Sequence, residues 1–123
     1  MIGYVTLGTN DLARAARFYD ALAEAIGAKR IFEVETSIVW ATPGGTALDI
    51  TMPFDGNPAT VGNGVMVALQ CRDSAQVDAV YNLAMSMGAS SEGAPGPRPG
   101  IDGFYAGYFR DPDGNKLNAF VMG

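Results

Sequence analysis

Two polar residues at matching positions of an internal repeat are the first candidates for chemistry. Asp49 ends the segment "TALD" and Asn118 ends "NKLN", and their surroundings, "PGGTALDI" (43–50) and "PDGNKLNA" (112–119), align at an offset of 69 residues (112 minus 43). A carboxylate can bind a cation or, where burial raises its pKa, take up a proton. An amide only exchanges hydrogen bonds. The repeat therefore predicts one polar group on each of two related strands.

The first strand of each half adds a second candidate position. Tyr4 in "YVTL" matches Met66 in "MVAL" at an offset of 62 (66 minus 4). Tyr4 and Asp49 are the candidates for proton transfer, and Met66 suits an adaptable ligand wall. For the predicted ligand-binding set the alternative role is packing or solvation, and for Asn118 it is a structural hydrogen bond. That set is Tyr4, Ile38, Trp40, Asp49, Met66, Tyr105, Phe109, Asn118 and Arg98.

The composition restricts metal chemistry. The chain holds no histidine and a single cysteine, Cys71. Histidine is the commonest metal ligand, and one thiolate cannot build a zinc site, so a metal would need oxygen ligands alone. We therefore predict no metal and no cofactor. Cys71 cannot form an internal disulfide and is interpreted as a small apolar residue in a strand.

Charge and hydropathy limit the partners. Eight basic residues stand against 13 acidic ones, a net charge of −5, and this argues against nucleic acid as a partner. The acidic balance is compatible with a cationic ligand. No apolar run approaches the roughly 20 residues of a membrane helix, and no basic-then-apolar signal segment opens the chain. We expect a cytoplasmic protein that contacts neither membrane nor nucleic acid.

Apolar spacing predicts two helices, at 12–26 and 75–87, preceded by the capping stretches "TND" and "RDS" and followed by glycine. The segment 90–103 is predicted to be a long loop, in which Arg98 could clamp a carboxylate or phosphate, although its first residues could form a short strand. Alternation and turn residues predict the strands, which are 2–8, 29–35, 37–42, 46–52, 65–71, 104–110 and 115–122.

These elements make two copies of a β-α-β-β-β pattern. We predict one α+β domain with two modules, about 1–54 and 64–123, joined by a Pro/Gly-rich linker at about 55–63. A single helix covers one sheet face, so the two half-sheets would form a cupped, mixed sheet around a cleft. Alternation puts Tyr4, Asp49, Met66 and Asn118 on the cleft face. Pairing across the hairpins is expected to add Ile38, Trp40, Tyr105, Gly107 and Phe109.

The stretches "VTLGTNDLARAARFYDAL" and "YFRDPDGNKLNAF" resemble the vicinal oxygen chelate superfamily, which includes glyoxalase I, extradiol dioxygenases, fosfomycin-resistance enzymes and bleomycin-binding proteins. The resemblance covers essentially the whole chain and is closest to bacterial glyoxalase-like members. It implies the two-module fold and a homodimer. It also implies that metal ligands, usually His and Glu, would stand at Tyr4, Asp49, Met66 and Asn118. Three of these four positions depart from that pattern, and only Asp49 is a carboxylate.

Three functions remain open on this sequence. The first is a glyoxalase- or bleomycin-resistance-like protein that binds a small, for example cationic, organic molecule in its cleft without a metal centre. The second is an enzyme of the superfamily (a lyase, isomerase or dioxygenase relative) that uses Tyr4 or Asp49 for proton transfer. The third is a non-catalytic dimeric regulatory module.

Overall fold

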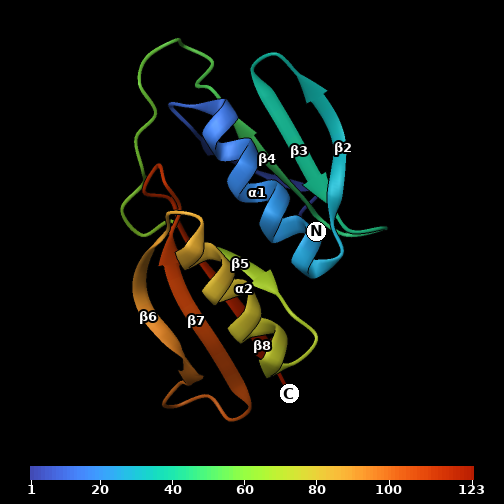
Figure 1. The fold of residues 1–123 in the computed structure, drawn as a ribbon, viewed down its shortest axis with the longest axis vertical. Coiled ribbons are helices and arrows are strands. Elements are labelled where there is room, and N and C mark those ends of the chain that lie inside the picture. Colours follow the sequence, from blue (N-terminus) through green and yellow to red (C-terminus); the bar gives the residue numbers. More distant parts are fainter.

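The computed structural model describes all residues, 1–123, as two β-α-β-β-β modules (Figure 1). The elements of the first module are β1 (Tyr4–Gly8), α1 (Leu12–Ile26), β2 (Lys29–Val34), β3 (Ser37–Ala41) and β4 (Ala47–Thr51). Those of the second are β5 (Val67–Gln70), α2 (Ser74–Ser86), β6 (Ser90–Pro97), β7 (Phe104–Arg110) and β8 (Lys116–Met122).

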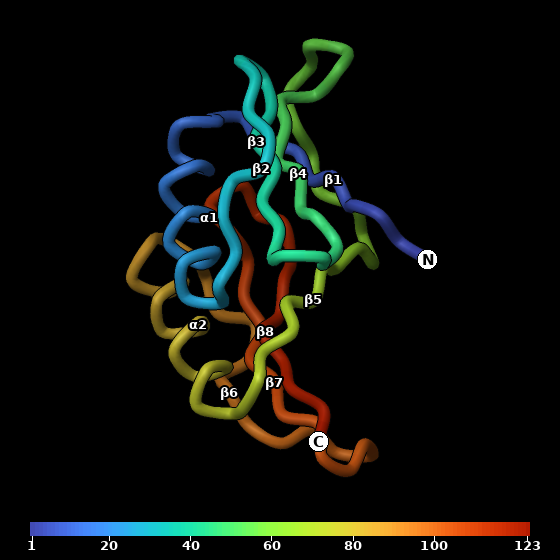
Figure 2. Tube along the Cα trace, turned by 90° about the vertical axis from the view of Figure 1, so that its right-hand side faces the viewer, coloured from blue at the N-terminus to red at the C-terminus, as the bar shows by residue number.

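Each module contributes its own mixed sheet of four strands. The strand orders are β1-β4-β3-β2 and β5-β8-β7-β6, with the first pair of each sheet parallel and the others antiparallel. No backbone pairing joins the two sheets. The predicted α+β architecture of two β-α-β-β-β modules is therefore confirmed. Figure 2 shows both helices on one side of the molecule, so each sheet keeps one face free of helix, which we call its open face.

Local sequence explains where the helices begin and end. The side chains of Asp11 and Asp73 accept hydrogen bonds from the backbone N–H groups three residues later, Arg14 and Gln76, which caps both N-termini. Gly27 ends α1 in the left-handed conformation, with φ of 81°. Both predicted helices are thus confirmed, within one residue at each end for α2.

The predicted loop at 90–103 is largely a strand instead. β6 runs over eight residues, Ser90–Pro97, and pairs antiparallel with β7. Its register shifts twice, between Ser91 and Gly93 and between Gly93 and Gly96. Glycine and proline are typical of loops, but an edge strand tolerates both because one of its sides makes no ladder hydrogen bonds. The composition of this segment therefore concealed a strand.

The hydrophobic core lies between the helices and the sheets, and it corrects the predicted orientation of two strands. Ile38 pairs with Ile50 and Trp40 pairs with Leu48, and these partners belong to the helix-covered face. Ile38 and Trp40 are each only 4% exposed. In the second module Phe109 pairs with Leu117 and is fully buried. Directly paired residues share a sheet face, so these strands were predicted one residue out of register, which turned their side chains to the wrong side.

Tyr105 and Gly107 are corrected in the same way. Tyr105 pairs with Val121, and its hydroxyl donates to Asp78 of α2 at 2.7 Å. Gly107 lies against the Tyr81 ring, where a Cβ would come within 3.1 Å. Both residues therefore face α2 instead of the open face of their sheet. The hydrogen bond to Asp78 also raises the pKa of Tyr105.

The β7–β8 turn of the second module holds the two modules together. The Asp111 carboxylate, 4% exposed, accepts from the Tyr19 hydroxyl of α1 at 2.6 Å and from the Asn115 side-chain amide at 3.0 Å. Asp113 accepts from the Arg14 guanidinium at 2.8 Å and from the backbone N–H of Asn10. The sequence DPDGN thus supplies a turn whose side chains bind the start of α1 and the loop before it.

Candidate functional site

The open face of the first module carries a carboxylate that is already occupied. Asp49, on β4, accepts from the Thr6 hydroxyl at 3.1 Å through Oδ2 and from the Ser37 hydroxyl through Oδ1. These donors come from β1 and β3, the two neighbours of β4 in the sheet. Tyr4 lies further along the same face of β1, is 68% exposed and makes no side-chain hydrogen bond. The two candidates for proton transfer do not contact each other, and Asp49 is engaged by the protein's own hydroxyls.

The open face of the second module carries an amide that lacks a partner. Asn118 is 2% exposed, and its Oδ1 accepts no hydrogen bond. Its neighbours in the sheet are Ala68 on β5 and Tyr108 on β7, which share its face. Met66 immediately precedes β5 and is 40% exposed. Asp49 and Asn118, related by the repeat, therefore differ in surroundings as well as in charge.

These four positions do not fit a metal. Tyr4 and Asp49 belong to the first sheet, Asn118 belongs to the second, and Met66 lies just before β5; no strand pairing joins the two sheets. No group of three or more His, Cys, Asp or Glu residues gathers anywhere in the protein. Hard cations require several oxygen ligands, preferably charged, and a thioether suits soft ions. The one carboxylate in the set already accepts two hydroxyls.

An apolar cleft of about 610 Å³ lies at the junction of the two modules. Its walls come from α1 and the helix-covered face of the first sheet, and from β5 with the residues just before it. None of the lining side chains is charged. Trp40 and Met66, both predicted to bind a ligand, line it together with residues that the sequence did not indicate, among them Leu22, Leu48, Val65 and Phe120.

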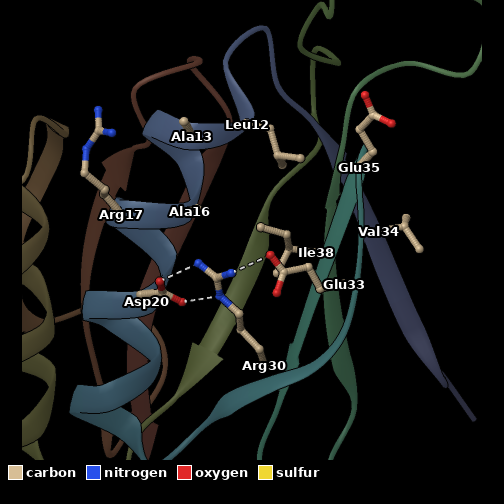
Figure 3. A pocket seen from close by; sticks show the side chains of 10 residues that line it. All are labelled: Leu12, Ala13, Ala16, Arg17, Asp20, Arg30, Glu33, Val34, Glu35 and Ile38. Carbon is tan, nitrogen blue, oxygen red and sulfur yellow. Dashed lines mark hydrogen bonds and ion pairs between the residues drawn. The ribbon is translucent and has the colours of Figure 1, made fainter.

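A second, smaller cleft of about 510 Å³ lies between α1 and β2, and its lining includes two basic and three acidic side chains (Figure 3). The Arg30 guanidinium donates to both oxygens of Asp20, at 2.9 and 2.7 Å, and to Glu33 at 2.9 Å. The Trp40 indole also donates to Asp20, at 2.8 Å. The hydrogen bond from Arg30 is the main reason that the pKa of Asp20 is lowered. Ile38 also lines this cleft. Asp20, Arg30 and Glu33 bind one another there, whereas the side chains of Arg17 and Glu35 make no hydrogen bond or ion pair.

Two buried ionisable groups remain neutral at ordinary pH. Burial, together with the neighbouring Asp111 carboxylate, raises the pKa of the Tyr19 hydroxyl well above its usual range. Burial likewise raises the pKa of the Cys71 thiol to about 11, which keeps it protonated and unreactive. Tyr19 therefore stabilises the junction of the modules through its hydrogen bond to Asp111, and Cys71 contributes to packing.

Arg98 lies outside the apolar cleft, on the open face of the second module. Its guanidinium stacks over the Tyr108 ring, with Cζ 5.1 Å from the ring centroid. The ammonium of Lys116 lies 5.7 Å from the same centroid. The sequence reasoning missed Tyr108 and Lys116. The alternation along 104–110, taken in the correct register, would have placed Tyr108 beside Asn118.

Comparison with known proteins assigns the chain to a family. A sequence model of the Glyoxalase/Bleomycin resistance protein/Dioxygenase superfamily matches residues 1–119, and the chain belongs to this superfamily. None of the curated proteins matches it. A glyoxalase/bleomycin resistance protein from Albidiferax ferrireducens T118 is 34% identical, with a TM-score of 0.92 over 100% of this chain and 99% of that one.

More distant structures share the fold. A glyoxalase/bleomycin resistance protein/dioxygenase family enzyme from Burkholderia phytofirmans PsJN is 16% identical, with a TM-score of 0.77 over 98% of this chain and 97% of that one. A lactoylglutathione lyase from Agrobacterium tumefaciens is 21% identical, with a TM-score of 0.72 over 98% and 92%. The resemblance predicted from the two sequence stretches is confirmed. Neither helix of the chain is long and apolar enough to cross a membrane.

Proposed function

We propose that this protein binds a small, largely apolar organic molecule in the cleft between its modules and does so without a metal centre. The observation that carries the proposal is the cleft itself, about 610 Å³ in volume and free of charged side chains. Ligand sites in proteins have volumes of roughly 300–1,000 Å³ and are lined mainly by hydrophobic groups. Without a carboxylate in the lining, the cleft favours a neutral molecule over the cationic one considered from the sequence.

The cleft also provides a source of affinity. Burial of apolar area stabilises a complex by roughly 25 cal/mol per Å². Trp40, Met66 and Phe120 present aromatic and thioether surface, and the few polar groups include Thr42 and Gln70, which can orient a ligand. Such binding needs no catalytic group, and Asp49, the main alternative for catalysis, already accepts two hydroxyls.

We further propose that the protein works as a homodimer. The strands β1 and β5 are edge strands, and large apolar residues near them are exposed, including Ile2 at 57%, Val65 at 51% and Met66 at 40%. Exposed edges and apolar patches favour association, and homodimers with twofold symmetry are the commonest assemblies. Sedimentation equilibrium tests this: we expect twice the monomer mass of 12.9 kDa, and a monomer at all concentrations would contradict it.

Fluorescence of Trp40 provides a direct test of ligand binding. Trp40 is the single tryptophan of the chain and lines the cleft. We expect energy transfer from Trp40 to the neutral, apolar probe N-phenyl-1-naphthylamine, with saturable binding that excess EDTA does not change. Neutral aromatic and aliphatic compounds would then be ranked by their displacement of the probe.

A pair of variants localises the binding. Ala68 is exposed and lines the cleft, so Ala68→Phe should fill part of it and weaken probe binding at least tenfold. Ala79→Phe makes the same change on the exposed side of α2, away from the cleft, and should leave binding unchanged. Equal affinities in the two variants, or no saturable binding by the native protein, would refute the proposal.

A further inference from the structure

We propose that the open face of the second module binds an organic anion, a carboxylate or phosphate group carried by a small molecule, between Arg98 and Lys116. Neither cation lines the apolar cleft, although the proposed site adjoins it at Ala68, which lines the cleft and pairs with Asn118. Its ligand is an anion, whereas the acidic composition of the chain is compatible with a cationic ligand.

The two cations have no counter-ion within the protein. Arg98 donates only to backbone carbonyl groups, those of Ala94 at 2.8 Å, Gly96 at 3.3 Å and Pro97 at 3.4 Å. Lys116 is half-buried and makes neither a hydrogen bond nor an ion pair. All ion pairs of the protein involve other cations, as in Arg110 with Glu92 at 3.0 Å. Arg98 and Lys116 therefore form a cationic patch that no acidic side chain neutralises, although the chain has a net charge of −5.

The ring of Tyr108 contacts both cations. The Tyr108 centroid lies 5.1 Å from the Arg98 guanidinium carbon and 5.7 Å from the Lys116 nitrogen. Cation–π contact favours this arrangement, yet two like charges beside one ring repel each other. An anion that bridges them removes the repulsion and gains charge-assisted hydrogen bonds.

The backbone of β6 fixes the Arg98 side chain in place. A Cβ on Gly93 would lie 3.4 Å from one terminal nitrogen of Arg98, and a Cβ on Gly96 would lie 3.5 Å from the other. The guanidinium therefore rests along a strand surface that glycine keeps flat. Because its side chain is already held in place, Arg98 loses little entropy when the N–H groups that the carbonyl groups of β6 leave free bind a carboxylate or phosphate. The Gly/Pro composition of 92–97 thus has a use besides forming a turn.

Asn118 provides an independent indication of a ligand at this place. Its Oδ1 is buried without a donor, on the face and beside the ring that carry the two cations. Unpartnered buried polar atoms are rare in folded proteins and call for an explanation. A ligand with a hydroxyl next to its acid group supplies the missing donor. The chemical class that fits all three residues is a small hydroxy acid or its phosphate counterpart.

Titrations followed by NMR at the amides of Tyr108 and Asn118 test this site. The probes are mandelate, phenyl phosphate, the neutral analogue mandelamide and inorganic phosphate. We expect saturable shifts with mandelate or phenyl phosphate and at least tenfold weaker binding of mandelamide. High salt should weaken the binding of the anions. Tighter binding of one organic anion identifies the acid group preferred. Equal binding of mandelamide, or shifts confined to the apolar cleft, would overturn the proposal.

Substitutions of the two cations test whether the anion binds at this site. Lys116→Gln removes a charge that makes no structural hydrogen bond, and it should weaken anion binding at least fivefold. Lys29→Gln is the matched control, because Lys29 is exposed on β2 of the other module. Arg98→Gln should weaken binding further, with Arg72→Gln, exposed and remote, as its control. Asn118→Leu should reduce mandelate binding severalfold but leave phenylacetate, which lacks the hydroxyl, unaffected. Equal affinities of Lys116→Gln and Lys29→Gln would exclude the site.

Discussion

The two modules follow the same path through space but present different chemistry on their open faces. In the first, each carboxylate oxygen of Asp49 accepts a hydrogen bond from a hydroxyl group of a neighbouring strand. In the second, Asn118 at the equivalent position has an unpartnered oxygen beside two unpaired cations. The β-α-β-β-β scaffold therefore fixes where a side chain points, and the residue types on each copy determine what it can bind.

The hairpin turns that precede these two positions also differ. Residues 43–45, Pro-Gly-Gly, form an exposed turn in the first module. The matching Pro-Asp-Gly at 112–114 places Asp113 against the start of α1, and Asp111 accepts from Tyr19. One copy of the turn only reverses the chain, whereas the other joins the modules. Substitutions at matched positions should therefore have very unequal effects.

The largest effect is expected for Asp111→Ala. This change leaves the buried Tyr19 hydroxyl and the backbone N–H groups of Asp113 and Asn115 without their acceptor. Each orphaned donor costs about 1–3 kcal/mol, so the free energy of unfolding should fall by at least 3 kcal/mol. Thr42→Ala, at the matching position (111 minus 69), should change it by less than about 0.5 kcal/mol. Urea titrations measure the free energy of unfolding of both variants. Comparable losses in the two would contradict the conclusion that the 111–114 turn joins the modules.

The next effect concerns the matched tyrosines, Tyr19 and Tyr81. Tyr19→Phe loses a buried hydrogen bond to a carboxylate, worth about 1.5–3 kcal/mol, whereas Tyr81→Phe loses one to the Ser91 hydroxyl, worth about 1 kcal/mol. The two variants also differ in pH dependence. The folded state raises the pKa of Tyr19 above 10.0, so its contribution is complete below pH 10 and is lost as the pH rises further.

Urea titrations at pH 8 and pH 11 would measure this pH dependence. Above pH 10 the native protein should lose up to about 1.4 kcal/mol per pH unit through Tyr19, and Tyr19→Phe should abolish that part of the slope. Tyr81→Phe should retain it. If both variants followed the native slope, Tyr19 would not be responsible for the alkaline loss of stability.

Sequence patterns predicted the elements better than they predicted the site. Helical spacing and the capping stretch "TND" placed α1 at its observed bounds, since both signals are local. Alternation also put Asp49 and Asn118 on the open faces. Trp40 and Phe109 were assigned to the wrong face because the register across each hairpin was predicted one residue out. Their pairing with Leu48 and Leu117 decides the face, and the sequence does not fix that pairing.

The apolar cleft was not predictable from strand alternation. It arises where α1 of one module meets β5 of the other, so its walls depend on how the modules dock. That docking is set by contacts such as Tyr19 with Asp111, which lie 92 residues apart in the chain. The same limit applies to Arg98, whose position against Tyr108 follows from an irregular edge strand that reads as a loop.

A substitution at each of the two equivalent polar positions would sharpen the contrast between the open faces. Asp49→Leu removes the acceptor of two hydroxyls and should cost about 1 kcal/mol of unfolding free energy. Asn118→Leu loses no acceptor bond at Oδ1, so the ligand-free protein should be unchanged or more stable by up to about 1 kcal/mol. Thermal and urea unfolding provide both values. A cost above about 1 kcal/mol for Asn118→Leu would show that its amide is engaged in the free protein.

The smallest expected effect is the difference in stability between Lys116→Gln and Lys29→Gln when no ligand is bound. Lys116 lies with Arg98 beside one ring, so Lys116→Gln removes repulsion and should raise stability by about 0.3 kcal/mol at low salt. Lys29 is exposed in a chain of net charge −5, so Lys29→Gln should leave stability equal or slightly lower. Both differences should vanish in 1 M NaCl, where the Debye length is about 3 Å. Urea midpoints at low and high salt measure them, and a loss of stability in Lys116→Gln at low salt would mean that an acidic group of the protein already neutralises the patch.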